Sequence, residues 1–368
     1  MKEIITLDGT PLLYPNGGVG RVTKTLLDTM SSLDSEYEFR LYARQKSGDS
    51  LKDLERKEQC THLRWPQFTE PLIKGLSLIE RLTGADLVHA TDHYLPVGKA
   101  EKSIVTVHDL IFLVEPETRW KQHDYLAKVV PDYLRKCKHI ITCSEYSKQD
   151  MIKHLNIAEE KISVILWGID KTVFKPAENR EKLLKEIQEE FSFDKPYFLS
   201  VACSVGRKNT PMLLECYQEL LKENPEHELI IVWNPPDEIR EKYKNEKRIH
   251  FTGRVSDQKL VELYQGANVL IYPSSYEGFG LPVLEAMSTD TAVITSSATS
   301  IPEVGGDSVI YIDHKDKASL LEAMRSIDRD EATIERLIVE GRERAKLFSW
   351  ERCARETLEV YKSCLETL

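Results

Sequence analysis

The sequence lacks two features that would define whole classes of protein. No apolar run approaches the ~20 residues that a membrane-spanning helix needs. The net charge is −10, whereas a general nucleic-acid binder presents a basic face, so we expect no nucleic-acid partner. A strand-like run at 3–7 opens the chain without a signal peptide before it. We therefore expect a cytoplasmic protein.

Cysteine is sparse, and no metal-ligand pattern accompanies it. Seven cysteines are spread from Cys60 to Cys364, an odd number that suits reduced thiols. Cys137 and Cys143 lie close together, and we interpret them as packing residues. No ligand set has tetrahedral or facial spacing, so we expect no metal site. Asp-Arg-Asp at 328–330 resembles the Asp-x-Asp of metal-dependent transferases, but its charged helical surroundings favour a solvated surface.

Two common catalytic motifs are also missing. His-Asp at 108–109 could suggest nucleophilic catalysis, but no Gly-x-Ser-x-Gly elbow accompanies it. Pro-Asn-Gly-Gly-Val-Gly-Arg at 15–21 follows the first strand, and its glycines allow the close backbone approach of a phosphate-contacting turn. It is not G-x-G-x-x-G, so a nicotinamide site is weakly supported. A plain tight turn is the alternative.

The composition that remains is that of a globular protein with two domains. Hydrophobic residues make up 41% and charged residues 30% of the chain, which is ordinary, and 368 residues suffice for two cores. Strand-like and helix-like patterns alternate along both halves, which is typical of α/β domains with parallel sheets. Prolines at 176 and 196 flank a charged helical run, so we place a domain boundary there.

Polar residues follow several of the predicted strands. His89 and His108 fall at the ends of buried strands, and Arg207 and Lys208 follow the first strand of the C-terminal half. Residues at the carboxyl ends of parallel strands line the crevice where open α/β sheets bind ligands. Arg and Lys can neutralise a diphosphate there. Structural histidines and exposed basic turn residues are the alternatives.

One stretch, Ser-Ser-Tyr-Glu-Gly-Phe-Gly-Leu-Pro-Val-Leu-Glu at 274–285, organises the rest of the chain. It follows a buried, strand-like run, and its glycines and Pro282 predict a turn and then a helix start. The backbone N–H groups of such a start favour a bound phosphate. Glu277 and Glu285 would then place one carboxylate near each sugar beside a diphosphate. An ordinary helix start with favourably placed acidic residues is the alternative.

This stretch resembles the signature of the retaining glycosyltransferases of family four. The two Glu, the seven-residue spacing between them and the five interior residues Gly-Phe-Gly-Leu-Pro all agree. The Gly-Gly loop, the histidine loop at 106–110 and Arg-Lys-Asn at 207–209 extend the resemblance over nearly the whole chain. One departure is Ala202, where the family usually has Gly.

The resemblance implies an α/β fold of two Rossmann-like domains that face each other across a cleft, the GT-B architecture. We place an acceptor-binding domain at 1–175, a linker at 176–195 and a nucleotide-sugar-binding domain at 196–348. A C-terminal helix at 349–368 would cross back to the N-terminal domain.

The resemblance also implies roles for single residues. Glu277 and His108 would contact the donor sugar, and Arg207 and Lys208 would clamp the leaving diphosphate. Glu285 would hold the ribose, and the backbone at 253–255 would meet the base. The predicted donor-binding residues are Gly18, Val255, Phe279, Gly280, Leu281 and Glu285.

The implied function is transfer of a hexose from GDP-mannose or a UDP-hexose to an acceptor hydroxyl, with retention of configuration, in the synthesis of a cell-surface polysaccharide or glycolipid. Arg207, Lys208 and the helix start would supply the positive charge, so we expect no metal and no cofactor beside the donor substrate. A sugar-nucleotide epimerase of the same architecture and a non-catalytic sugar-nucleotide binding protein are the alternatives.

A basic island at 119–139 offers a further contact. It carries six Lys or Arg against two Asp, with apolar residues interleaved in an amphipathic pattern. One interpretation is a surface helix with its charges in water. The other is weak contact with a glycolipid acceptor or the inner membrane face, because basic amphipathic segments lie on acidic lipids.

Overall fold

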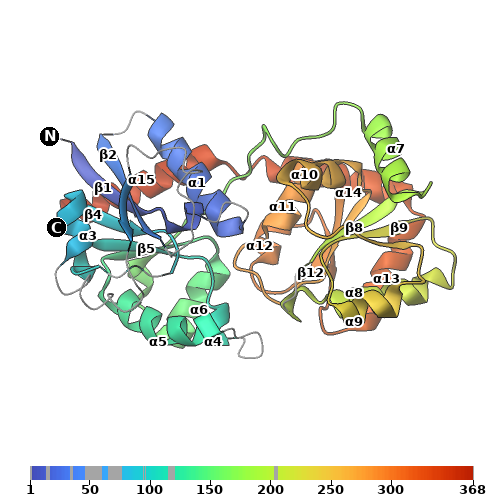
Figure 1. Ribbon diagram of the computed structural model, residues 1–368, viewed down its shortest axis with the longest axis horizontal. Coiled ribbons are helices and arrows are strands. Elements are labelled where there is room, and N and C mark those ends of the chain that lie inside the picture. The colour runs from blue at the N-terminus through green and yellow to red at the C-terminus, as the bar shows by residue number, and fades with distance from the viewer. Residues whose placement is uncertain are drawn as a thin grey trace. The chain divides into compact units, whose positions relative to one another are not determined.

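The computed structural model of the protein describes residues 2–13, 17–33, 36–45, 60–64, 77–93, 95, 97–114, 121–202 and 206–367. The chain divides into two compact units (Figure 1). The first unit comprises Met1–Gly168 and Ser349–Leu368, and the second comprises Ile169–Phe348. The N-terminal segment of the first unit ends at Gly168, before the boundary at 175 that the sequence predicts.

Within the described residues, the first unit is built on a parallel sheet of seven strands in the order β3-β2-β1-β4-β5-β6-β7. The strands are β1 Glu3–Asp8, β2 Tyr37–Gln45, β3 Cys60–Arg64, β4 Leu87–Ala90, β5 Ser103–Val107, β6 His139–Thr142 and β7 Ile162–Val164. Its α-helices are α1 Gly18–Ser32, α3 Leu78–Thr83, α4 Ile111–Val114, α5 Lys121–Lys136, α6 Glu145–Leu155 and α15 Trp350–Glu366.

The second unit repeats this architecture with a parallel sheet of six strands in the order β10-β9-β8-β11-β12-β13. The strands are β8 Tyr197–Val201, β9 Glu228–Val232, β10 Ile249–Phe251, β11 Val269–Tyr272, β12 Ala292–Ser296 and β13 Ile310–Ile312. Its α-helices are α7 Arg180–Phe191, α8 Thr210–Leu221, α9 Asp237–Tyr243, α10 Asp257–Gly266, α11 Leu281–Ser288, α12 Ile301–Gly305, α13 Lys317–Asp328 and α14 Glu331–Ala345.

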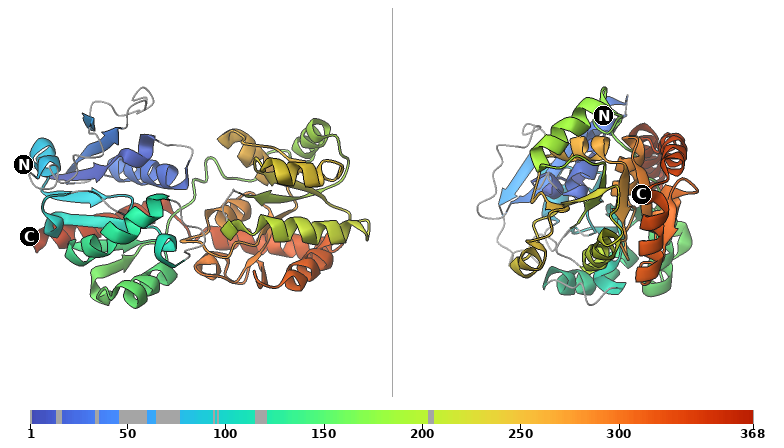
Figure 2. Two further views of the ribbon diagram at one scale, coloured as in Figure 1. Left: turned by 60° about the horizontal axis from the view of Figure 1, so that its bottom comes forward. Right: turned by 90° about the vertical axis from the view of Figure 1, so that its right-hand side faces the viewer.

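Both sheets are doubly wound. Helices cover both faces of each sheet (Figure 2), which explains why the strands read as continuous apolar runs. In each unit the chain first winds outward from a central strand and then returns to that strand's other side. This reversal lies between β1 and β4 in the first unit and between β8 and β11 in the second. Ligands of open α/β sheets bind at such switch points.

The C-terminal helix α15 completes the first unit, as the sequence predicted. Its buried residues pack into one core with residues of β1 and α1. The hydroxyl of Tyr361 lies 2.6 Å from Nδ1 of His89, whose Nε2 lies 2.8 Å from Oγ1 of Thr106. The backbone also approaches closely, because a Cβ added to Gly168 would lie only 2.1 Å from the backbone nitrogen of Trp350.

The Asp-Arg-Asp stretch does not form the predicted solvated surface throughout. The Asp328 side chain is only 6% exposed and accepts hydrogen bonds from the backbone N–H groups of Glu226 and His227. The ring of His227 lies 3.0 Å from the same carboxylate. The prediction was wrong for Asp328 because the end of α13 meets the start of β9, where backbone N–H groups need an acceptor. Asp330 is exposed and caps α14.

Cys137 and Cys143 are buried free thiols that donate to backbone carbonyl groups, so they are packing residues as predicted. Among the described helices, none combines the length and the apolar character needed to cross a bilayer.

Candidate active site

The predicted site residues of the second unit come together at its switch point. Arg207 and Lys208 lie in a short 3-10 turn after β8, and Glu277 lies in the loop after β11. The two loops are tied to each other, because Ser275 N–H donates to the carbonyl oxygen of Arg207 at 2.7 Å and Nη1 of Arg207 donates to that of Tyr276 at 2.8 Å. Neighbouring parallel strands thus bring residues far apart in sequence into one cluster.

Glu277 is held between the two cations. Nζ of Lys208 lies 2.7 Å from Oε1 of Glu277, and Nη1 of Arg207 lies 2.8 Å from Oε2. The Glu277 residue is only 8% exposed. Burial alone would raise the pKa of the Glu277 carboxyl, but the charges of Lys208 and Arg207 outweigh it and lower that pKa to about 2. Glu277 is therefore ionised, and the cluster carries one surplus positive charge.

Two further side chains bond the Glu277 carboxylate. The hydroxyl of Tyr272, the last residue of β11, donates to Oε1 at 2.7 Å, and the hydroxyl of Ser274 donates to the same atom. Nζ of Lys208 also donates to the Tyr272 hydroxyl and lies 4.4 Å from the centre of its ring. Burial and the Glu277 charge raise the pKa of Tyr272 well above its ordinary value. Tyr272 therefore remains a neutral donor.

The backbone of Glu277 is fixed as well. The hydroxyl of Thr299 accepts from Glu277 N–H at 3.0 Å, and both Thr299 and Ser300 have their hydroxyl oxygens within 3.0 Å of the Glu277 carbonyl oxygen. These residues follow β12, the next strand of the sheet. Carboxylate and backbone are thus both positioned before any ligand arrives.

The helix start predicted after Glu277 is present. Gly280 precedes α11 with φ of 110°, a conformation that favours glycine, and Pro282 occupies the first turn of the helix. Phe279 is 2% exposed and Leu281 is half-buried. The first N–H groups of a helix have no partners inside it and favour an anion.

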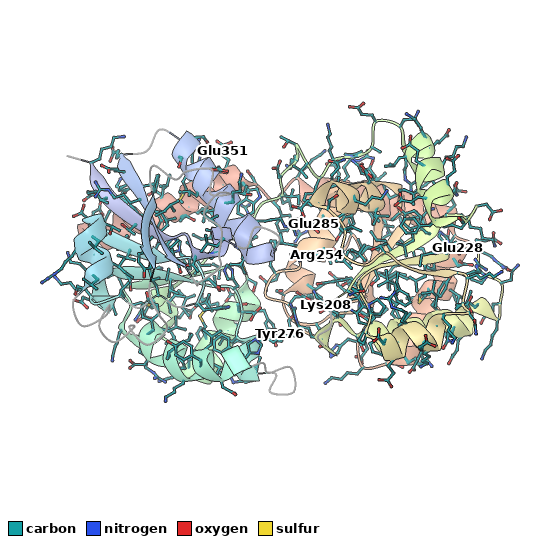
Figure 3. The ribbon with its side chains drawn as sticks, viewed as in Figure 1. Lys208, Glu228, Arg254, Tyr276, Glu285 and Glu351 are labelled. Atoms are coloured by element: carbon teal, nitrogen blue, oxygen red, sulfur yellow. The ribbon has the colours of Figure 1, made fainter. Side chains whose placement is uncertain are left out.

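Two further predicted donor-binding residues belong to the second unit. Glu285 projects from α11 and is 3% exposed. Val255 is half-buried in the connection between β10 and α10. Figure 3 shows Lys208, Tyr276, Glu285 and Arg254 along the same side of the second unit, with Glu228 on the other side.

Gly18 and His108 belong to the first unit. Gly18 is exposed at the first residue of α1. The predicted glycine turn is therefore mostly the first turn of this helix, and neither Gly18 nor Gly20 has positive φ. Residues 15 and 16 of the predicted loop lie outside the described residues.

His108 is buried at the end of β5. Its Nε2 lies 2.9 Å from the carbonyl oxygen of Thr91, so Nε2 carries a hydrogen and Nδ1 is an acceptor in the neutral ring. The ring packs against Trp167 and His93 at 5.2 and 5.5 Å between ring centres. Burial lowers the pKa of His108, although Asp92 opposes this shift. The ring lines a cavity of about 20 Å³, enough for about one water molecule.

The sequence left both histidines open to a functional or a structural role. His89 is the structural one, because its two ring nitrogens bond Tyr361 and Thr106 inside the first unit. Burial and the nearby His108 lower the pKa of His89 to about 3. In the part of the chain that the structure describes, no cluster of three or more His, Cys, Asp or Glu could hold a metal ion.

Comparison with known proteins decides the family. Residues 16–173 match the model described as Glycosyltransferase Family 4, and residues 182–344 match that of Glycosyl transferases group 1. The chain is a family-four glycosyltransferase. The transferase is 29% identical over 390 residues to O-antigen chain mannosyltransferase B of Escherichia coli, covering 98% of this chain and 100% of the relative. It is 28% identical over 261 residues to O-antigen chain mannosyltransferase RfbU of Salmonella typhimurium, covering 69% and 68%.

Solved structures agree on the fold of this transferase. Sucrose-phosphate synthase of Thermosynechococcus elongatus matches with a TM-score of 0.79 at 20% identity, covering 100% of both chains. A glycosyltransferase from Rickettsia africae matches with a TM-score of 0.78 at 18% identity, also covering 100% of both. The architecture is therefore GT-B, as predicted. None of these comparisons supports the epimerase alternative.

Sequence reasoning missed several residues of this site. Tyr272, Ser274, Thr299 and Ser300 hold Glu277, and Arg254 lies on the same side of the unit. Their common signal is position, since each lies at or just after the carboxyl end of a strand. Applying the strand-end rule to every strand, rather than to charged pairs and histidines alone, would have found them.

Proposed function

We propose that this transferase moves a mannosyl group from a nucleotide-diphosphate donor to a hydroxyl of a growing cell-surface polysaccharide, with retention of the anomeric configuration. The observation that carries the proposal is the end-to-end similarity to an O-antigen chain mannosyltransferase of Escherichia coli. A second mannosyltransferase of O-antigen chains, from Salmonella, supports the same sugar and the same kind of product.

The cation cluster supports the chemistry. The bond from the anomeric carbon to the diphosphate breaks, and negative charge develops on the leaving oxygen. Arg207, Lys208 and the start of α11 are placed to stabilise that charge, which is usually the largest single contribution to catalysis. A bond forms from the acceptor oxygen to the anomeric carbon, and the leaving phosphate takes the acceptor's proton. No side chain is then needed as a base.

Glu277 has a different role in this scheme from a simple sugar contact. Both of its carboxylate oxygens are engaged, one by Arg207 and one by Lys208. We propose that Glu277 positions these cations and shares them with the incoming diphosphate. Glu285 would bond the ribose, and Val255, Phe279, Gly280 and Leu281 would shape the donor site. Gly18 and His108 would contribute the donor contacts of the first unit.

The test is a transfer assay with the purified protein. GDP-mannose, UDP-glucose and UDP-galactose are each incubated with an acceptor oligosaccharide that ends in mannose, and the product's anomeric configuration is read by NMR. We expect transfer of mannose with retention, undiminished by EDTA. Transfer of another hexose alone, an inverted product, or loss of activity in EDTA that Mg²⁺ or Mn²⁺ restores would contradict the corresponding part of the proposal.

A further inference from the structure

Arg254 is the exception among the arginines of the second unit. Every other arginine there donates hydrogen bonds to a described carboxylate, amide or carbonyl group, as Arg180, Arg248 and Arg344 do. Arg254 is exposed and makes no hydrogen bond or ion pair with any residue that the structure describes. An exposed arginine without a partner among the described residues is available to a ligand.

The backbone beneath Arg254 is nevertheless fixed. Gly253, with φ of 69°, donates from its N–H to the carbonyl oxygen of Trp233 at 3.0 Å. On the other side, the Ser256 hydroxyl caps α10 by accepting from Lys259 N–H. A Cβ added to Gly253 would meet nothing within 4 Å, so the space beside Gly253 is open. The exposed Arg254 side chain thus extends from a turn that is fixed on both sides.

The position of Arg254 suits the nucleotide base better than the diphosphate. It follows β10, which is two strands away from β8, the strand that carries Arg207 and Lys208. Neighbouring strands lie about 4.8 Å apart, so Arg254 starts about 10 Å from the cation cluster along the sheet edge. A ribose between diphosphate and base spans a comparable distance. Figure 3 shows Arg254 on the same side of the unit as Glu285, the predicted ribose contact.

We infer that Arg254 selects guanine as the base of the donor nucleotide, through two parallel N–H donations to O6 and N7; this rests on the proposed function of the second unit as the donor site. A guanidinium carries parallel donors and no acceptor. Guanine presents two adjacent acceptors to it, whereas adenine presents one acceptor beside an amino donor. Each of the two carbonyl oxygens of uracil lies next to the N3–H donor, and neither has a second acceptor beside it. The two parallel donors of the guanidinium therefore fit guanine alone among these bases.

The experiment is a calorimetric titration of the full-length protein with GDP, inosine diphosphate, 7-deaza-GDP, UDP and ADP. Inosine diphosphate keeps O6 and N7, so we expect it to bind the wild type about as well as GDP. We expect 7-deaza-GDP, UDP and ADP to bind more weakly. Arg254→Ala should weaken GDP and inosine diphosphate about 5- to 150-fold, the discrimination of one bidentate pair, and leave UDP and ADP nearly unchanged.

Two variants make the outcome decisive. Arg254→Lys keeps the charge but loses the fork, so it should behave like Arg254→Ala towards GDP. Arg336→Ala removes a charge from the exposed Arg336–Glu340 pair on α14 and should change nothing. Equal losses for GDP, UDP and ADP, or rescue by Arg254→Lys, would overturn guanine selection and indicate a phosphate contact. No binding of any nucleotide diphosphate by the wild type would instead overturn the proposed function.

Discussion

In the first unit, His89 and His108 are buried and their pKa values are lowered, so both rings are neutral. In the second unit, Glu277 is buried to a similar degree, but two cations hold it ionised. Both units have the same doubly wound sheet, and in both the buried groups lie near the carboxyl ends of strands. The fold therefore decides where the groups lie, and their immediate neighbours decide their charge.

This difference indicates a division of labour. A buried ion cluster is costly to desolvate and seldom adds net stability, so its presence in the second unit favours a role with a charged ligand. Of the neutral histidines of the first unit, His89 holds α15 through Tyr361, and His108 lines a small cavity with an uncharged ring. The charged environment of the second unit suits a diphosphate, and the uncharged environment of the first unit suits sugar hydroxyls.

The largest expected effect comes from removing a cation of the second unit. Lys208→Ala or Arg207→Ala should each lower turnover by about 10²- to 10³-fold, as the loss of one oxyanion donor does elsewhere. Steady-state kinetics measures this, with Arg336→Ala as the charge-matched control. A loss below tenfold for both variants would place the leaving group elsewhere.

The next effect concerns the attachment of α15 to the first unit. Gly168→Ala would place a Cβ 2.1 Å from the backbone nitrogen of Trp350 and should lower the free energy of unfolding by about 1–3 kcal/mol, the usual cost of overpacking. Gly18→Ala, whose Cβ meets nothing within 4 Å, is the control. Equal stability of the two variants in urea would show that this close approach does not constrain the unit.

The two units should also respond to acid in different pH ranges. The pKa of His89 is about 3 when folded and 6.5 ordinarily, so its stability contribution is full above pH 6.5 and declines by about 1.4 kcal/mol per pH unit below it. Glu277 has a pKa of about 2 against 4.5, so its contribution persists down to pH 4.5 and is lost between 4.5 and 2. Hydrogen exchange at pH 7, 6 and 5 should therefore show the first unit loosening first. Simultaneous loosening would contradict the assigned charge states.

The smallest effect concerns the basic island. The side chains of Arg119 and Trp120 lie outside the described residues, and the described apolar face of α5 packs into the core through Val130, Tyr133 and Leu134. In the described part of this segment we therefore expect membrane contact through exposed charges such as Lys128, Arg135 and Lys136, at about 1 kcal/mol each.

We predict weak, salt-sensitive sedimentation with anionic vesicles for the wild type. The variant in which Lys128, Arg135 and Lys136 are all replaced by Glu should not sediment. If the wild type stays in the supernatant at low salt, the island is a solvated surface only.

Much of the fold and of the site could be predicted because strand periodicity and glycine-rich turns are local signals. Alternation of strands and helices predicted α/β domains with parallel sheets, and the motif around Glu277 predicted α11 and its start. The predictions that were wrong or incomplete depended on contacts between distant segments. Asp328 looked like a surface residue because its partners, the N–H groups before β9, lie about a hundred residues away.

Contacts between distant segments also explain why the predicted role of Glu277 was incomplete. The sequence placed it near the donor sugar, but nothing local indicates that Arg207 and Lys208 occupy both of its oxygens. Nor does the sequence indicate that the Arg254 guanidinium lacks a partner among the described residues, because this depends on which residues surround it in the fold.

The measurement that tests the account most directly compares nucleotide binding and turnover in Glu277→Gln and Glu285→Gln. If Glu277 shares its cations with the diphosphate, Glu277→Gln should bind a nucleotide diphosphate at least as tightly as the wild type while turnover falls. Glu285→Gln should lose affinity through the ribose contact, by the roughly 1.5–3 kcal/mol of a charged hydrogen bond. Weaker binding by Glu277→Gln, equal to that of Glu285→Gln, would contradict the shared-cation account.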